Sequence, residues 1–224
     1  MGYLSWHEQP GYWRDVTRHF PPSTVLLDVG CGGAWLADHY ERYTGVDSSP
    51  EAVDAGRSRG REVVLADVDS ALPFGDAEFG GVVMKDLLEH VSDPAAVVRE
   101  AYRVLRPEGR VFASSPDAQR WVWDDYTHRR PFTRKSFRLL FDDQGFEVEQ
   151  VGYESVTPGV GVLSGLMRSN RRPGPVRAGE LRTRLTCTSL VASSQSPRRI
   201  GSRSPARRRR WQADRGGIHE KLVP

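Results

Sequence analysis

The sequence predicts an α/β fold in which helices cover both faces of a mostly parallel sheet. From about Val25 onward, short apolar segments alternate with segments of helical pattern, which is typical of a parallel sheet. Three successive apolar segments each end in an aspartate, at Asp28, Asp47 and Asp67. Because parallel strands end at one edge of such a sheet, and ligands bind at that edge, the pattern predicts a ligand site there.

The first predicted strand, Leu26–Val29, runs directly into a glycine turn that contains Gly30 and Gly32. Glycine lacks a Cβ, so the backbone can turn sharply and approach a ligand closely. No Gly-Lys-Ser/Thr follows, which excludes a Walker loop. The complete Gly-x-Gly-x-x-Gly pattern is also absent, because Trp35 stands three residues after Gly32. Cys31 fits this turn as a small residue.

The second and third strands are predicted at Tyr43–Asp47 and Glu62–Ala66, the latter followed by Asp67. In dinucleotide-binding folds, an acid about 20 residues after the glycine turn binds the ribose hydroxyls. Taken singly, each aspartate has the alternative role of a helix N-cap or turn residue.

The remaining elements follow from helical periodicity, capping residues and short apolar runs. Asp93 and Thr133 are predicted N-caps, as is either Ser48 or Ser49. The helices are predicted at Tyr12–Phe20, Ala34–Tyr40, Pro50–Arg57, Pro94–Leu105 and Thr133–Phe141. The later strands are predicted at Gly81–Met84, Arg110–Ser114, Gly145–Val151 (as an edge or antiparallel strand) and Leu185–Ala192.

Six motifs follow one another between about Val25 and Tyr153: Asp28-Val29-Gly30-Cys31-Gly32, Gly45-Val46-Asp47, Ala66-Asp67, Leu72-Pro73-Phe74, Leu88-Glu89-His90-Val91 and Val104-Leu105-Arg106-Pro107-Glu108-Gly109-Arg110. In these motifs the chain resembles class I S-adenosylmethionine-dependent methyltransferases, in particular the small-molecule enzymes of methyltransferase type 11. The resemblance implies a Rossmann-like fold with a seven-stranded, mostly parallel sheet.

The same resemblance implies S-adenosylmethionine as the cofactor. The turn at Gly30 and Gly32 would hold its methionine part, Asp47 its ribose and Asp67 its adenine amino group. The expected cofactor-binding residues are Asp28, Gly30, Cys31, Gly32, Asp47, Ser48, Asp67, Val68 and Lys85.

A second group of polar residues follows the fourth predicted strand, and Asp86, Glu89 and His90 would converge if they formed one helical turn. His128 is a further candidate ligand. Carboxylate oxygens with imidazole nitrogens suit Mg²⁺, Mn²⁺ or Fe²⁺. The group resembles the metal site of small-RNA 3′-terminal 2′-O-methyltransferases and a motif of quinone-biosynthesis O-methyltransferases, with Asp86 in place of a glutamate. The alternative is a polar pocket lining without metal.

A hydroxyl acceptor has to lose a proton, whereas an amine needs little beyond alignment with the methyl group. His128 is the first candidate base and His90 the second, because an imidazole titrates near neutral pH. Either histidine has the alternative of a structural or surface role. Lys85 is a third candidate catalytic residue, and Lys85 and Asp86 are expected to border the acceptor. Trp121, Trp123 and Tyr126 either form a flat apolar wall for it or only pack their loop.

Composition fits one domain of 224 residues, and the two cysteines, Cys31 and Cys187, predict neither a disulfide framework nor a Cys-based zinc site. No apolar run approaches the ~18 residues of a membrane span. The expected location is a reducing cytoplasm, without a membrane partner.

Positive charge is concentrated at the C-terminal end: 15 of the 32 Lys and Arg residues, but 3 of the 29 acidic ones, lie from Arg168 onward. The preceding part is therefore acidic, which disfavours nucleic-acid binding there. The expected organisation is a helical lid at residues 1–22, a methyltransferase domain at 23–193 and a basic tail at 194–224. Disorder is expected over residues 195–224, or from Asn170 if the seventh strand is absent. The tail is either an arm for RNA or an acidic partner, or a dispensable solvated segment.

The sequence thus predicts transfer of a methyl group to oxygen or nitrogen of a small molecule in bacterial biosynthesis. The alternatives are a metal-assisted RNA 2′-O-methyltransferase, aided by the basic tail, and a cofactor-binding partner protein without catalysis. The acceptor and the oligomeric state are left open.

Overall fold

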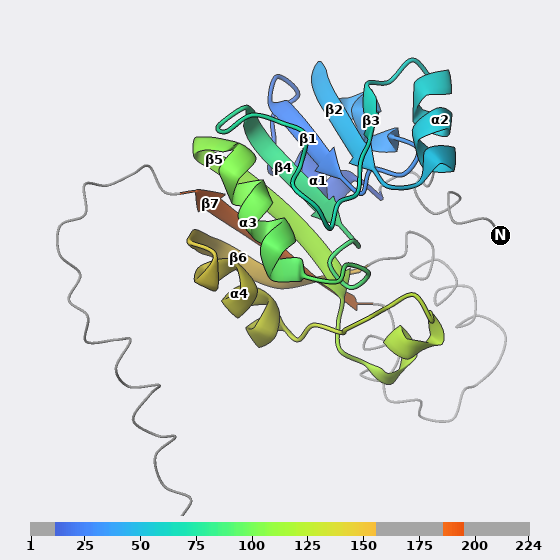
Figure 1. Cartoon of the computed structure of the whole chain (residues 1–224). Coiled ribbons are helices and arrows are strands. Elements are labelled where there is room, and N and C mark those ends of the chain that lie inside the picture. The colour runs from blue at the N-terminus through green and yellow to red at the C-terminus, as the bar shows by residue number, and fades with distance from the viewer. Residues whose placement is uncertain (1–11, 156–185, 195–224) are drawn as a thin grey trace, which may run out of the picture.

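The computed structural model describes residues 12–155 and 186–194, which form one seven-stranded sheet with helices on both faces (Figure 1). The strand order is β3-β2-β1-β4-β5-β7-β6. Neighbouring strands from β3 to β5 pair in parallel, and β7 is antiparallel to both β5 and β6. The strands are β1 (Val25–Val29), β2 (Arg42–Asp47), β3 (Val63–Leu65), β4 (Phe79–Lys85), β5 (Leu105–Pro116), β6 (Phe146–Ser155) and β7 (Thr186–Ser194). The predicted fold class, including the seventh strand, is confirmed.

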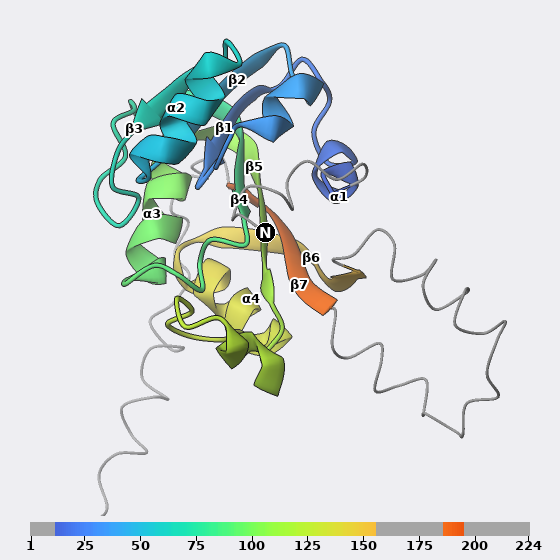
Figure 2. The ribbon, with the colours of Figure 1, turned by 90° about the vertical axis from the view of Figure 1, so that its right-hand side faces the viewer.

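The α-helices begin close to their predicted starts. They are α1 (Arg14–Thr17), α2 (Pro50–Ser58), α3 (Pro94–Val104) and α4 (Arg134–Asp143). Figure 2 shows α1 on one side of the sheet and α3 with α4 on the other. Side-chain oxygens of Ser49, Asp93 and Thr133 accept hydrogen bonds from backbone N–H groups in the first turns of α2, α3 and α4. The predicted caps therefore fix where these helices start.

Two predicted helices differ from the structure. The segment Tyr12–Phe20 contains only the single turn of α1. The segment Ala34–Tyr40 forms a 3₁₀ helix at Trp35–His39, which follows the left-handed residue Ala34 (φ 57°). Short 3₁₀ turns of this kind are common connectors, and periodicity alone does not separate them from a short α-helix.

The sheet separates two apolar clusters, because side chains alternate along each strand. In β4, Val82 and Met84 belong to the cluster that includes residues of α3 and α4. Val83 points the other way and joins the cluster around Val16 of α1 and Phe112 of β5. Both faces are therefore covered, as the near-continuous apolar strands require.

The strand register places the polar strand ends at one edge of the sheet. Asp28 of β1 lies opposite Gly45 of β2 and Val83 of β4, and Lys85 lies opposite Ser114 of β5. The loops that follow these strands consequently meet at the same edge, where they build the candidate site.

Some predictions concern residues outside those that the structure describes. These are the first eleven residues of the predicted lid and the disordered tail over residues 195–224. Among the described residues, no helix combines the length and the apolar character needed to cross a bilayer.

Gly45 offers a test of the packing beneath the first two strand ends. A Cβ added there would lie 2.6 Å from the Sγ atom of Cys31 and 3.1 Å from the hydroxyl oxygen of Tyr43. Gly45→Ala should lower the free energy of unfolding by ~1–3 kcal/mol through overpacking, measured by urea denaturation. Gly75→Ala is the control, because its nearest new contact, at 3.5 Å from Glu78, is an ordinary one. Equal stability of the two variants would contradict the packing described.

Candidate functional site

The glycine turn after β1 requires its glycines. Gly30 and Gly32 have φ angles of 75° and 53°, in the left-handed region that favours glycine. The backbone N–H groups of Gly30 and Cys31 both donate to the carbonyl oxygen of Val46, at 2.8 and 3.2 Å. A Cβ on Gly30 would lie 2.8 Å from Cδ1 of Leu87, so the turn also packs closely under the segment that follows β4.

The carboxylate of Asp47 holds this turn from the neighbouring strand. Its Oδ2 accepts a hydrogen bond from the N–H of Gly32 at 2.8 Å, and its Oδ1 accepts one from the N–H of Ser49 at 2.9 Å. Asp47 is 9% exposed, and the adjacent Ser48 is exposed. A nearly buried anion with its oxygens oriented by two amides is well placed to accept further hydrogen bonds from a ligand.

Asp28 lies beneath the turn and is buried. It accepts a hydrogen bond from the hydroxyl of Tyr43 at 2.8 Å. Burial raises the pKa of Asp28 to about 7, with a smaller contribution from the charge of Asp47, while the Tyr43 hydrogen bond opposes the shift. Burial also raises the pKa of the Cys31 thiol, so Cys31 packs as a small neutral side chain.

Asp67 and Val68 follow β3 at the same edge. Asp67 is exposed, and its oxygens accept hydrogen bonds from the N–H of Asp69 at 3.0 Å and the hydroxyl of Ser70 at 3.3 Å. Val68 is buried in the larger apolar cluster. The exposed carboxylate is thus accessible to a ligand, while Val68 supports it from below.

Lys85 and Asp86 end β4 in a network with the N-terminal segment. Tyr12 donates from its hydroxyl to Oδ2 of Asp86 at 2.9 Å, and Ser114 donates to Oδ1 at 2.8 Å. The ammonium of Lys85 lies 4.0 Å from Oδ2 of Asp86 and 4.4 Å from the centroid of the Tyr12 ring. Asp86 has a φ of 52°, a strained conformation for a non-glycine residue that the surrounding hydrogen bonds maintain.

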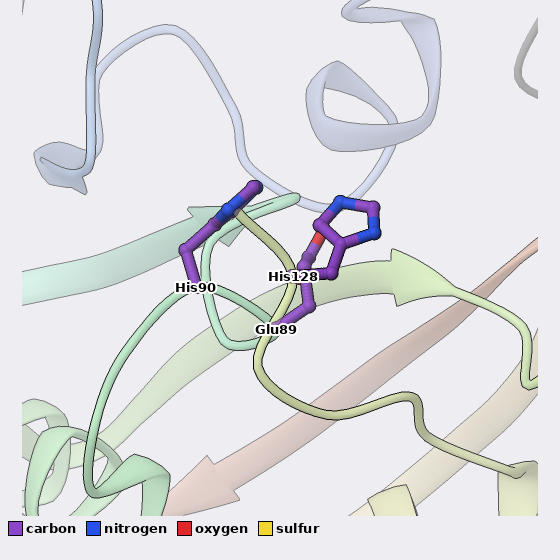
Figure 3. A group of neighbouring side chains, drawn as sticks. All are labelled: Glu89, His90 and His128. Carbon is purple, nitrogen blue, oxygen red and sulfur yellow. The ribbon is translucent and has the colours of Figure 1, made fainter. Parts of the chain in front are cut away.

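Glu89, His90 and His128 come together from two segments, the turn after β4 and the loop between β5 and α4 (Figure 3). One ligand atom from each, a carboxylate oxygen and two imidazole nitrogens, lies within 4.8 Å of the others. The rings of His90 and His128 have centroids 4.7 Å apart. Asp86 does not belong to this group, because its left-handed backbone prevents the helical turn assumed for residues 86–90 and its oxygens accept from Tyr12 and Ser114.

Glu89 is the least satisfied polar side chain of this group. It is 1% exposed, and neither of its carboxylate oxygens accepts a hydrogen bond of normal geometry from a described residue. Burial raises the pKa of Glu89 well above its ordinary value, and the charge of Asp86 adds to this, while Ser115 and Lys85 oppose it. The pKa of His90 is lowered by burial and by the neighbouring His128. A buried carboxyl without a partner calls for an absent cation, proton donor or water.

The three side chains fit a divalent ion. In a tetrahedral site, ligand atoms at ~2.1 Å from the ion are ~3.4 Å from one another, so side-chain movements on the order of 1 Å would bring all three into range. Two imidazoles with one carboxylate favour a first-row transition metal such as Fe²⁺ or Zn²⁺ over Mg²⁺, which prefers oxygen ligands. Three protein ligands also leave a position for water or an acceptor oxygen.

Two aromatic residues of the β5–α4 loop, Trp123 and Tyr126, face solvent. Trp123 is 56% exposed and Tyr126 is 96% exposed, so packing of the loop does not account for Tyr126. The side chain of Trp121 lies outside the described part of the structure.

Sequence reasoning missed several members of the site. Tyr43 and Ser114 hydrogen-bond to Asp28 and Asp86, and Thr127 hydrogen-bonds to His90. These contacts join residues far apart in the chain, and no local pattern signals them.

The comparisons with known proteins agree with this geometry. Residues 27–113 match the family model described as a methyltransferase domain. A ubiquinone biosynthesis O-methyltransferase of Xylella fastidiosa is 34% identical over 111 residues, which cover 45% of this chain and 45% of that protein. The chain therefore spans less than half the length of the curated relatives it matches.

Two solved structures share the fold. A candidate methyltransferase in complex with the Haloferax volcanii Trm112 methyltransferase activator has a TM-score of 0.66 and 18% identity, covering 85% of this chain and 90% of that one. The cyclase SpnF has a TM-score of 0.60 and 22% identity, covering 81% and 79%. At these identities the likeness establishes the fold, and the function has to be argued from the site.

The raised pKa of Asp28 predicts a pH dependence of stability. The folded state keeps the Asp28 proton up to a pKa of about 7, whereas an unfolded aspartate, with a model value of 3.8, loses it earlier. The Asp28 proton therefore contributes up to ~4 kcal/mol to the free energy of unfolding. This contribution is fully present below pH 4 and is lost as the pH rises to 7. In Asp28→Asn this part of the decline should disappear, as measured by urea denaturation between pH 5 and pH 8. Parallel pH profiles for the variant and the parent protein would rule out the shift.

Proposed function

We propose that this chain, whose described residues form a class I S-adenosylmethionine-dependent methyltransferase domain, transfers a methyl group to an oxygen or nitrogen atom of a small molecule. The observation that carries the proposal is the glycine turn held by Asp47, beside a cluster of polar side chains at the same edge of the sheet. The turn has the shape to bind a cofactor, and the polar side chains of the cluster could bind an acceptor and take up its proton.

The cofactor would lie across the ends of β1, β2 and β3. Gly30, Cys31 and Gly32 would follow its methionine part, because a turn without side chains at Gly30 and Gly32 lets the backbone approach. Asp47 and Ser48 would bind the ribose, and Asp67 with Val68 the adenine. Asp28 supports the turn from below, and Lys85 borders the methionine part from β4.

S-adenosylmethionine, when bound, supplies an electrophilic methyl group, so the chain has to orient the acceptor and remove its proton. Lys85 and Asp86 border the acceptor in this proposal, with Asp86 held by Tyr12 and Ser114. When no metal is bound, His128 is the first candidate to accept the proton and His90 the second, because an imidazole nitrogen that binds a metal cannot also act as a base. Both lie beside Glu89 at the end of β4 and in the loop that follows β5.

We also propose that Glu89, His90 and His128 hold a divalent metal ion. The unpartnered buried carboxylate of Glu89 supports this proposal. Such an ion would lower the pKa of an acceptor hydroxyl, which is the chemistry that an oxygen acceptor needs.

A small-molecule acceptor is supported by the acidic character of the sequence before Arg168, which is unfavourable for a polyanion such as RNA. It is also supported by the curated relatives named ubiquinone biosynthesis O-methyltransferases. The proposal is tested against two alternatives. One is RNA methylation, aided by the basic residues after Arg168, and the other is cofactor binding without catalysis.

Within this proposal, residues 23–193 form the catalytic domain, residues 1–22 cover its site and residues 194–224 form a basic tail. The hydrogen bond between Tyr12 and Asp86 supports the covering role of the N-terminal segment.

The proposal is tested with S-adenosylmethionine labelled on its methyl group and a bacterial extract separated into small-molecule and RNA fractions. We expect label in a low-mass product. Label in RNA alone would favour RNA methylation, and cofactor binding without label in either fraction would favour a non-catalytic binder.

Asp47→Ala should weaken binding of S-adenosylmethionine by ~1.5–3 kcal/mol, the cost of losing a charged hydrogen-bond acceptor. Calorimetry gives the dissociation constant, and thermal denaturation shows whether the variant still folds without the bond to Gly32. Asp54→Ala, which changes an exposed aspartate on α2, is the matched control. An unchanged dissociation constant would remove Asp47 from the cofactor site.

Removal of metal should abolish methyl transfer while leaving cofactor affinity unchanged, because the metal ligands are separate from Asp47 and the glycine turn. The measurement is turnover after exhaustive chelation, followed by re-addition of Fe²⁺, Mn²⁺ or Zn²⁺. Full activity in the chelated enzyme would exclude a catalytic metal.

A further inference from the structure

The ring of His128 has a defined proton position. Its Nδ1 lies 2.5 Å from the carbonyl oxygen of Val122. A carbonyl oxygen can only accept, so Nδ1 carries the proton and donates it. In the neutral ring, Nε2 then keeps an unshared electron pair. The carboxylate of Asp125 lies 3.8 Å from this Nε2, which is too long for a hydrogen bond.

The ring of His90 is fixed in the same way, through a hydroxyl. Its Nδ1 lies 3.0 Å from Oγ1 of Thr127. Thr127 donates its one hydroxyl hydrogen to Oδ1 of Asp125 at 2.6 Å. The hydroxyl oxygen must therefore accept from His90, so Nδ1 of His90 carries the proton and Nε2 is again the atom with a free electron pair.

Asp125 orients this hydroxyl. The same Oδ1 atom accepts a second hydrogen bond, from the backbone N–H of Thr127 at 2.9 Å. Both hydrogen bonds from Thr127 are donated to this one carboxylate oxygen, which acts as the acceptor. An ionised acceptor at this position fixes the direction of the Thr127 hydroxyl bond.

One loop thus controls both imidazoles. It carries His128, and its Thr127 contacts His90. It is joined to the turn after β4 by the hydrogen bond from the N–H of Arg129 to the carbonyl oxygen of Glu89, at 2.7 Å. The third ligand, Glu89, is in this way tied to the loop that orients the other two.

We propose that Asp125 and Thr127 are positioning residues that fix the tautomer and ring orientation of His90, so that its Nε2 binds a first-row divalent metal ion together with Glu89 and His128. This inference rests on the metal site in the proposed function. Histidine ligands generally donate their second N–H to an outer partner, and loss of that partner costs ~10–100-fold in metal affinity. Here the outer partner of His90 is a hydroxyl held by a carboxylate.

The test is calorimetric titration of the full chain with Co²⁺ alone, with the visible absorption of Co²⁺ as a record of ligand geometry. Thr127→Val removes the hydroxyl and keeps the shape, and Thr127→Ser keeps the hydroxyl. We expect Thr127→Val to bind Co²⁺ ~10–100-fold more weakly, with an altered spectrum. Thr127→Ser should remain within ~3-fold of the parent protein, on the same principle.

Equal Co²⁺ affinity in Thr127→Val and the parent would overturn the inference, as would equal weakening in Thr127→Ser, which would indicate lost packing rather than a lost hydroxyl. Absence of Co²⁺ binding to the parent protein would also overturn it.

A second measurement does not need metal. Long-range proton–nitrogen NMR of the metal-free protein should show His90 protonated at Nδ1, and a mixture of tautomers in Thr127→Val. Protonation of His90 at Nε2 in the parent would overturn the inference.

The proposed function is measured separately on the same variants. If Thr127→Val leaves Co²⁺ affinity unchanged while the protein still binds S-adenosylmethionine and transfers methyl groups, Thr127 has no positioning role. The methyltransferase proposal then remains in place. Absence of both cofactor binding and transfer would remove the methyltransferase proposal.

Discussion

The candidate site depends on the parallel register of β1, β2, β4 and β5. Because Asp28 pairs in register with Gly45 and Val83, and Lys85 with Ser114, every polar strand end falls at one edge of the sheet. A shift of one residue in β4 would turn Lys85 to the other face and separate it from Tyr12. Val82 and Met84 pack into one apolar cluster and Val83 into the other, so a slipped strand would have to repack both clusters. Core packing therefore determines where the chemistry is placed.

This edge gathers carboxyl groups whose mutual repulsion has a measurable consequence. Burial and the charge of Asp47 raise the pKa of Asp28, and burial and the charge of Asp86 raise that of Glu89. Burial thus favours the protonated forms of Asp28 and Glu89. A positively charged ligand reverses the balance, since it stabilises the ionised carboxylates that burial disfavours. In the proposed function, the cationic ligands would be the sulfonium cofactor at the β1–β2 end and the metal ion at the β4–β5 end.

Sequence patterns were sufficient where the signal is local. The strand ends at Asp28 and Asp47, the caps Ser49, Asp93 and Thr133 and the left-handed glycines of the turn all follow from neighbouring residues. The seventh strand could be predicted from its apolar run, although its pairing between β5 and β6 could not. The sequence predicts the convergence of His128 with Glu89 and His90, which the structure shows. It also predicts Asp86 in this group, on the basis of a helical turn that the structure does not form. The left-handed backbone of Asp86 is maintained by Ser114 and Tyr12, which lie 28 and 74 residues away, and such contacts leave no local pattern.

The segment at the end of β4 contacts three other parts of the candidate site: the turn after β1, the N-terminal segment and the loop after β5. Leu87 packs against Gly30, so the segment after β4 contacts the turn after β1 directly. Tyr12 reaches across from the N-terminal segment to Asp86, and its ring lies over the ammonium of Lys85. On the other side, the loop after β5 is tied to the backbone of Glu89 through Arg129. A movement of either covering segment therefore changes the groups at the end of β4, whereas Asp47 and the glycine turn are held by bonds within the sheet edge itself. The groups at the end of β4 therefore depend on contacts from two distant segments of the chain, whereas the glycine turn depends on contacts between β1 and β2.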